Sequence, residues 1–93
     1  MAEHLSAVDG TVHGRVQGVG FRYRTQWAAD EQGVTGWVRN EYNGTVTFHA
    51  EGPKHRLDAF LATLRRGFPM ARITRLDVRH SSPEGYTSFR ILY

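Results

Sequence analysis

The chain has 93 residues, of which 40% are hydrophobic and 23% charged, and its mean hydropathy is −0.49. This length and composition favour one folded domain and exclude a disordered chain. Cysteine is absent, which excludes disulfides, thiolate metal ligands and cysteine nucleophiles. No stretch approaches the ~20 apolar residues of a membrane span, and residues 1–6 lack a signal-peptide pattern, so we expect a cytoplasmic protein.

Twelve Lys and Arg residues against nine Asp and Glu residues give a net charge of +3. Residues 1–40 sum to zero, so the whole surplus lies in residues 41–93. The strongest local excess is a group of arginines around Asp77, namely Arg65, Arg66, Arg72, Arg75 and Arg79. We interpret this group as a solvated face, because Arg75, Asp77 and Arg79 alternate along a predicted strand.

The first third of the chain predicts a strand followed by a helix. Apolar residues alternate imperfectly over residues 4–13, which favours a strand. Residues 21–32 contain no Gly or Pro, and Tyr23 and Trp27 lie four positions apart, so we expect a helix with both rings in the core. Gly33 is predicted to end the helix, because Gly adopts the positive φ of a helix terminus at little cost.

Residues 34–40 and 45–51 are predicted to pair as a hairpin. They flank Asn43-Gly44, the dipeptide that best tolerates the positive φ values of a tight turn. Apolar and polar side chains alternate along the second of these strands. One face of the sheet is therefore expected to be covered and the other to be polar.

The remaining residues predict a second helix and two further strands. Pro53 opens the helix, Gly67 and Pro69 follow it, and its core-facing stripe consists of Leu57, Phe60, Leu61 and Leu64. Alternation then predicts strands carrying Thr74, Leu76 and Val78, and Phe89, Ile91 and Tyr93. Together the elements predict an α+β, ferredoxin-like βαββαβ fold, in which a four- to five-stranded, mainly antiparallel sheet carries two helices on one face. This fold serves many functions, so it does not identify one.

The segment that carries chemistry joins the first strand to the first helix. Residues 13–22 read HGRVQGVGFR, with Gly14, Gly18 and Gly20 within seven positions. Such a segment can curl so that successive amides point inward around an anion, next to the positive end of the helix dipole. Arg22 lies in the first turn of that helix, where a cation is unfavourable unless an anion is bound nearby. Glycines at such a junction often serve only the turn, and this segment fits neither the Walker A nor the dinucleotide pattern.

Two segments resemble the two signatures of the acylphosphatase family. The first is residues 14–22, GRVQGVGFR, and the second is residues 36–40, GWVRN, followed by Gly44, Val46 and Gly52. The resemblance covers nearly everything after the first few residues. It implies a single acylphosphatase-like domain over residues 1–93, a monomer that hydrolyses the carboxyl-phosphate bond of small acyl phosphates without a cofactor or metal.

The resemblance also implies the residues of the site. Arg22 and Asn40 are the catalytic residues, with Arg22 binding the phosphate and Asn40 positioning the attacking water. Backbone groups that cradle the phosphate come from Arg15, Val16, Gln17, Gly18, Val19 and Gly20. The chemistry is compatible, because the departing carboxylate has a conjugate acid of pKa ~4 and needs no general acid. Charge stabilisation and alignment are then the main requirements of the reaction.

Three alternatives compete with this interpretation. The five histidines lack metal-ligand spacing, so we expect surface or structural roles, and only His13 borders the glycine-rich segment. A ferredoxin-like RNA-binding module would carry an aromatic signature that residues 45–49 do not have, so no nucleic-acid partner is expected. A non-catalytic phosphate-binding or carbamoyl-phosphate-related module is the third alternative.

Overall fold

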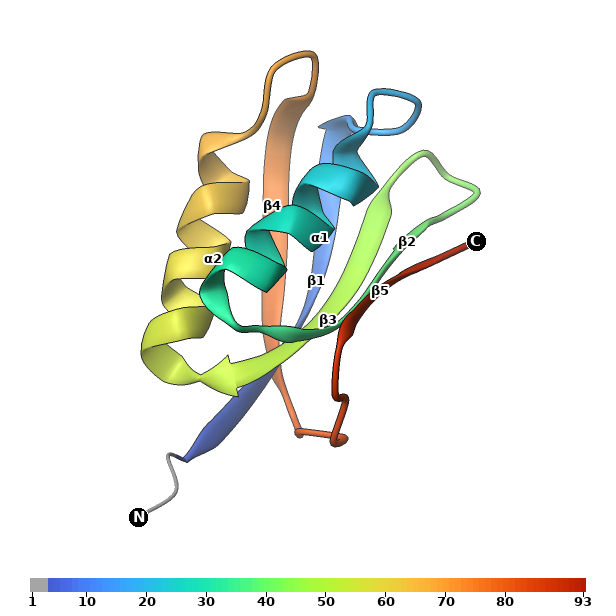
Figure 1. Cartoon of the computed structure of the whole chain (residues 1–93). Coiled ribbons are helices and arrows are strands. Elements are labelled where there is room, and N and C mark those ends of the chain that lie inside the picture. The colour runs from blue at the N-terminus through green and yellow to red at the C-terminus, as the bar shows by residue number, and fades with distance from the viewer. Residues whose placement is uncertain (1–3) are drawn as a thin grey trace.

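The computed structural model describes residues 4–93, which form five strands and two helices (Figure 1). In chain order these are β1 (Leu5–Arg15), α1 (Phe21–Gln32), β2 (Thr35–Asn40), β3 (Val46–Pro53), α2 (Lys54–Arg66), β4 (Arg72–Ser81) and β5 (Phe89–Leu92). The strands make one sheet in the order β4-β1-β3-β2-β5, with β5 parallel to β2 and the other pairs antiparallel. Both helices cover the same face of the sheet (Figure 1). The predicted α+β, ferredoxin-like architecture is confirmed.

The core lies between the two helices and the sheet. The predicted stripe of α2 is buried there as Leu57, Phe60, Leu61 and Leu64. On the sheet, the ring of Phe48 lies directly over Gly10, where an added Cβ would come within 2.2 Å of the ring. Gly10 is therefore required by this packing, since any larger residue would displace Phe48 from the core.

Helix α1 buries a different face from the predicted one. Tyr23 and Trp27 are 64% and 57% exposed, so the prediction that their rings enter the core is wrong. The buried residues of α1 are Phe21, Thr25, Ala28 and Ala29. Apart from Phe21 these side chains are small, which lets the helix approach closely to its neighbours and leaves the large rings outside. Gly33 ends the helix with φ of 69°, as predicted.

Strand β4 contains a shift in register that the sequence pattern did not reveal. Its pairing with β1 is irregular between His13 and Gly14. Leu76 and Val78 pack against the core, but Thr74, which alternates with them in the sequence, is exposed, and Ile73 packs against the core instead. An extra residue in one strand reverses the faces of the residues that follow, so simple alternation fails here.

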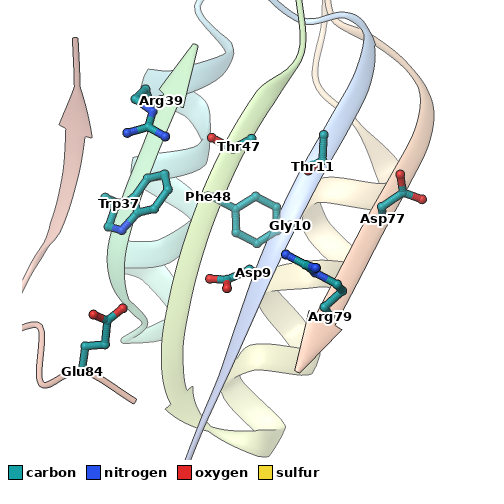
Figure 2. A pocket seen from close by; sticks show the side chains of 10 residues that line it. All are labelled: Asp9, Gly10, Thr11, Trp37, Arg39, Thr47, Phe48, Asp77, Arg79 and Glu84. Atoms are coloured by element: carbon teal, nitrogen blue, oxygen red, sulfur yellow. The ribbon is translucent and has the colours of Figure 1, made fainter. Parts of the chain in front are cut away.

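The hairpin between β2 and β3 forms as predicted, with Gly44 at φ of 89°. The opposite face of the sheet from the helices carries polar side chains, and a shallow cavity of about 630 Å³ lies on it (Figure 2). The arginines interpreted as a solvated face, from Arg65 to Arg79, are exposed. Within residues 4–93 no helix is long and apolar enough to cross a membrane.

Candidate phosphate site

The connection between β1 and α1, residues 16–20, is here called the glycine loop. Gly18 and Gly20 adopt φ of 74° and 77°, and an added Cβ at either position would meet nothing within 4 Å. What restricts these positions is therefore backbone conformation and not space, because L side chains rarely adopt such φ values. Gly20 is also the residue immediately before α1, so the loop leads directly into the positive end of that helix.

Two side chains of the glycine loop hold it in place. Val16 is buried in the core. Gln17 donates from Nε2 to the carbonyl oxygens of Glu41 at 2.7 Å and Thr45 at 2.9 Å, which ties the loop to the β2–β3 hairpin. Only backbone groups of Gln17 were expected at the site, because nothing in the sequence shows which hairpin an amide side chain will reach.

The backbone amides of the glycine loop are not used by the fold. Residues 17–20 form a bend, and their amides donate to no recorded acceptor in the part of the chain that the structure describes. Buried or crowded amides are normally paired with protein or water, so these amides are available to an external acceptor. Their position beside the first turn of α1 favours an anion.

Arg22 projects from the first turn of α1 and is held by the C-terminal end of the chain. Its Nη1 donates to the carbonyl oxygen of Leu92 at 3.2 Å, and its guanidinium lies 4.8 Å from the ring centre of Tyr93. The pKa of Tyr93 is raised above its ordinary value, mainly by a hydrogen bond with Tyr23. These contacts fix the guanidinium at the edge of the glycine loop.

Asn40 ends strand β2 and contributes an unused acceptor. Its Oδ1 is buried and has no hydrogen-bond partner among the described residues. A buried carbonyl oxygen without a hydrogen-bond partner lowers the stability of the fold, and a bound water commonly supplies the missing hydrogen bond. The position of this atom is therefore suited to hold a water molecule.

A small cavity of about 130 Å³ brings most of the predicted residues together. It is lined by Val16, Gly18, Gly20, Phe21, Arg22, Tyr23 and Asn40. This volume is large enough for a phosphate group. Three of the predicted residues do not line it: Arg15 ends β1, Gln17 lines an adjoining cavity of about 600 Å³, and Val19 packs against the core.

The side chains that could support other chemistry are engaged elsewhere. His13 pairs with Asp77 at 3.0 Å on the open face of the sheet. Glu41 accepts hydrogen bonds from Thr47 and Arg39, which together lower its pKa, so this carboxylate is committed to the hairpin. Among residues 4–93 no group of three or more His, Asp or Glu side chains could hold a metal ion. The remaining chemistry of the site is that of amides, one guanidinium and one carboxamide.

Comparisons with known proteins agree with this arrangement. The chain is 50% identical to an acylphosphatase of Methylococcus capsulatus over 89 residues, which is 95% of this chain and 97% of the relative. It is 48% identical to an acylphosphatase of Nocardioides sp. over 86 residues, covering 92% of this chain and 87% of that one. The crystal structure of acylphosphatase from Bacillus subtilis superimposes with a TM-score of 0.92 and 42% identity, and covers 97% of this chain and 100% of that chain. The family model named Acylphosphatase matches residues 8–91, and the chain therefore belongs to the acylphosphatase family.

Proposed function

We propose that this protein hydrolyses the carboxyl-phosphate bond of acyl phosphates, releasing a carboxylate and inorganic phosphate by direct attack of water on phosphorus. Family membership supports the reaction, and the observation that supports the mechanism is the meeting of loop amides, Arg22 and the unpaired Asn40 oxygen around one small cavity. The match over residues 8–91 supports a single acylphosphatase-like domain for residues 1–93.

The phosphate is bound by the glycine loop and Arg22. Amides of residues 17–20 surround the phosphate oxygens, and the guanidinium binds two of these oxygens at once. These donors are already in place before substrate binds, because β1, α1 and the hairpin hold them. They stabilise the charge that develops on the oxygens as the phosphoryl group is transferred.

Asn40 positions the attacking water. Its unpaired Oδ1 accepts a hydrogen bond from the water, and its NH₂ group donates to the substrate. A carboxamide is too weak a base to take the proton. No carboxylate or imidazole lines the cavity within residues 4–93, so a phosphate oxygen of the substrate accepts it.

The reaction then balances without a covalent intermediate. The water oxygen forms a bond to phosphorus while the bond between phosphorus and the acyl oxygen breaks. The electron pair of that bond leaves with the carboxylate, which needs no protonation because its conjugate acid has a pKa near ~4. The products are a carboxylate and a protonated inorganic phosphate.

Hydrolysis of benzoyl phosphate in the presence of a chelator tests this function. We expect stoichiometric benzoate and phosphate, and a solvent ¹⁸O label that appears in phosphate and not in benzoate. Label in benzoate would contradict attack on phosphorus, and the absence of turnover would favour the non-catalytic phosphate-binding module. The monomeric state, the cytoplasmic location and the absence of a nucleic-acid partner stay predictions, to be tested by size-exclusion chromatography, cell fractionation and an RNA-binding assay.

A further inference from the structure

A cluster of charged side chains, two of them buried, lies on the sheet face opposite the helices, and the proposed mechanism does not use it. It consists of Asp9, His49 and Glu51 and is called here the Glu51 cluster. His49 and Glu51 are only 1% and 2% exposed, although both lie on the polar face of β3. Residues this polar are rarely buried unless each is fully paired, so the partners of each one reveal what the cluster holds.

Glu51 holds the connection that leads into β5. Its Oε1 accepts from the amides of Gly85 at 2.9 Å and Tyr86 at 3.1 Å, and its Oε2 accepts from the amide of Glu84 at 2.6 Å. The Nε2 atom of His49 lies 2.7 Å from the same Oε2. Four donors around two oxygens require an ionised carboxylate, since a carboxyl proton would face another donor.

His49 is held between two carboxylates. Its Nδ1 lies 2.7 Å from Oδ1 of Asp9, while its Nε2 faces Glu51. A neutral imidazole carries only one N–H, so one of its nitrogens would present a lone pair to a carboxylate at this distance. Both nitrogens therefore donate, and His49 is an imidazolium.

Other charged groups face this imidazolium from the surrounding elements. A carboxylate oxygen of Glu84, on the connection before β5, lies 3.8 Å from Nε2, and Arg79 on β4 lies opposite Asp9 in the register of β1 and β4. Figure 2 shows Asp9, Arg79 and Glu84 together on this face of the sheet. The ring of Tyr86 packs 5.5 Å from the imidazole, and Trp37 is its uncharged neighbour on β2. The surroundings are more negative than positive, which favours the protonated form.

The connection held by Glu51 leads to the phosphate site through β5. This strand has four residues and pairs only with β2 in the described chain. Its first residue, Phe89, accepts from Gln26 of α1 at 3.0 Å, and its last, Leu92, accepts from Arg22 at 3.2 Å. Tyr93, the next residue, lies under the Arg22 guanidinium. The position of β5 thus sets the position of the phosphate-binding arginine.

We propose that Glu51, together with His49, is a positioning residue for phosphate binding, which fixes the connection at residues 84–86 and so the end of β5 that holds Arg22. This inference rests on the proposed function, because it assumes that Arg22 binds the phosphate. The link from the cluster to the site runs through Arg22 alone, by way of Leu92 and Tyr93. The glycine loop and Asn40 keep their own supports.

The main test is the phosphate affinity of Glu51→Gln, measured by calorimetry with inorganic phosphate as the probe. The substituted amide keeps the volume of Glu51 but brings an NH₂ group against amides that need an acceptor. We expect the Kd for phosphate and the KM for benzoyl phosphate to rise about three- to tenfold. Any fall in kcat should be no larger than this, because Asn40 and the loop amides are unchanged. The matched control is Glu31→Gln on the exposed end of α1, which should change neither constant.

The outcomes separate this inference from the proposed function. Lower stability of Glu51→Gln with unchanged phosphate affinity would overturn the inference, because the cluster would then be structural only. If the parent protein bound no phosphate, both the proposed site and this inference would fall.

A second measurement on the parent chain avoids any loss of folding in the variant. The Nε–H signal of Arg22 should shift in a pH titration with the same midpoint as the ring nitrogens of His49, which should both be protonated at pH 7. A signal of Arg22 that stays constant through the His49 titration would contradict the coupling.

Discussion

Two irregular stretches of this molecule present consecutive backbone amides. They differ in whether the chain itself supplies a hydrogen-bond acceptor for these amides. The amides of Glu84, Gly85 and Tyr86 all donate to the buried carboxylate of Glu51. Those of residues 17–20 donate to no recorded acceptor in the described part of the chain. At residues 84–86 the chain itself provides the anion, the Glu51 carboxylate, and the amides make a structural contact. At residues 17–20 the chain provides no anion, so the amides form a candidate binding site for an external one.

The placement of charged side chains follows the same difference. Around the 84–86 connection the chain concentrates carboxylates, with Asp9, Glu51 and Glu84 about His49. Around the glycine loop it places Arg22, and no carboxylate lines that cavity in residues 4–93. The overall charge of +3 therefore says little about the ligand. The relevant positive charge is one guanidinium beside a set of amides.

The largest effect is expected for Asn40→Ala, which removes the acceptor that we propose for the attacking water. Loss of one preorganised group of this kind typically lowers kcat by ~10² to 10³. Phosphate affinity should stay close to that of the parent, since the loop amides and Arg22 remain. Steady-state kinetics and calorimetry check the two halves of this prediction, and normal turnover would remove Asn40 from the mechanism.

Arg22→Lys should have the next largest effect, because it keeps the charge but removes the bidentate contact that we propose between the guanidinium and phosphate. We expect phosphate affinity to fall by about tenfold, which corresponds to ~1.4 kcal/mol. Arg24→Lys, on the exposed face of the same helix, is the matched control. Equal phosphate affinities for the two variants would exclude a special role for the Arg22 guanidinium.

A pair of glycine substitutions compares the two sets of amides directly. Gly18 and Gly85 have φ of 74° and 87°, and an added Cβ would meet nothing within 4 Å at either position. Alanine should therefore cost a similar ~1 to 2 kcal/mol of backbone strain at both. Urea unfolding should show comparable losses of stability, while phosphate affinity should fall further for Gly18→Ala. A larger loss of phosphate affinity for Gly85→Ala would reverse our assignment of the two regions.

The pH dependence of stability should come from the Glu51 cluster. Burial disfavours the charged forms of His49 and Glu51, but their mutual hydrogen bond and the other partners outweigh it, so the pKa of His49 is raised and that of Glu51 lowered. The contribution of His49 is complete below about pH 6.5 and is lost as the pH rises through its raised pKa. The contribution of Glu51 is complete above about pH 4.5 and is lost as the pH falls through its lowered pKa.

Urea unfolding across this pH range checks the prediction. His49→Gln should flatten the alkaline side of the stability profile, whereas His80→Gln, at an exposed position on β4, should not. An unchanged alkaline side in His49→Gln would show that the cluster does not control this dependence.

Local signals predicted the elements that depend on neighbours in sequence. The Asn43-Gly44 dipeptide correctly predicted the β2–β3 hairpin, and the apolar stripe of α2 correctly predicted which face of that helix is buried. The predicted burial of Tyr23 and Trp27 was wrong, because helical spacing shows that the two rings lie on the same side of the helix but not which side packs against the sheet. The alternation of Thr74 with Leu76 and Val78 does not carry through the strand, because the irregular pairing at His13 is set by contact between β1 and β4, which are distant in sequence.

The residues of the candidate site were predicted because they match the family signatures. The contacts that support these residues were not predicted. Arg22 and Asn40 come together at one cavity as the motifs suggested. The side-chain bonds of Gln17 to the hairpin, and those of Arg22 to the end of β5, join segments between 24 and 70 positions apart. The burial of Glu51 likewise depends on an irregular connection, whose path no periodicity describes.

The difference between the amides of residues 17–20 and those of residues 84–86 is tested most directly by titrating the parent protein with inorganic phosphate and following its backbone amide signals by NMR. We expect saturable shifts of the amide signals of residues 17–20 with one common Kd, and only small shifts of those of Glu84, Gly85 and Tyr86. Saturation of the second set with the glycine loop unaffected, or no saturation in either, would contradict the assignment of the glycine loop as the phosphate site.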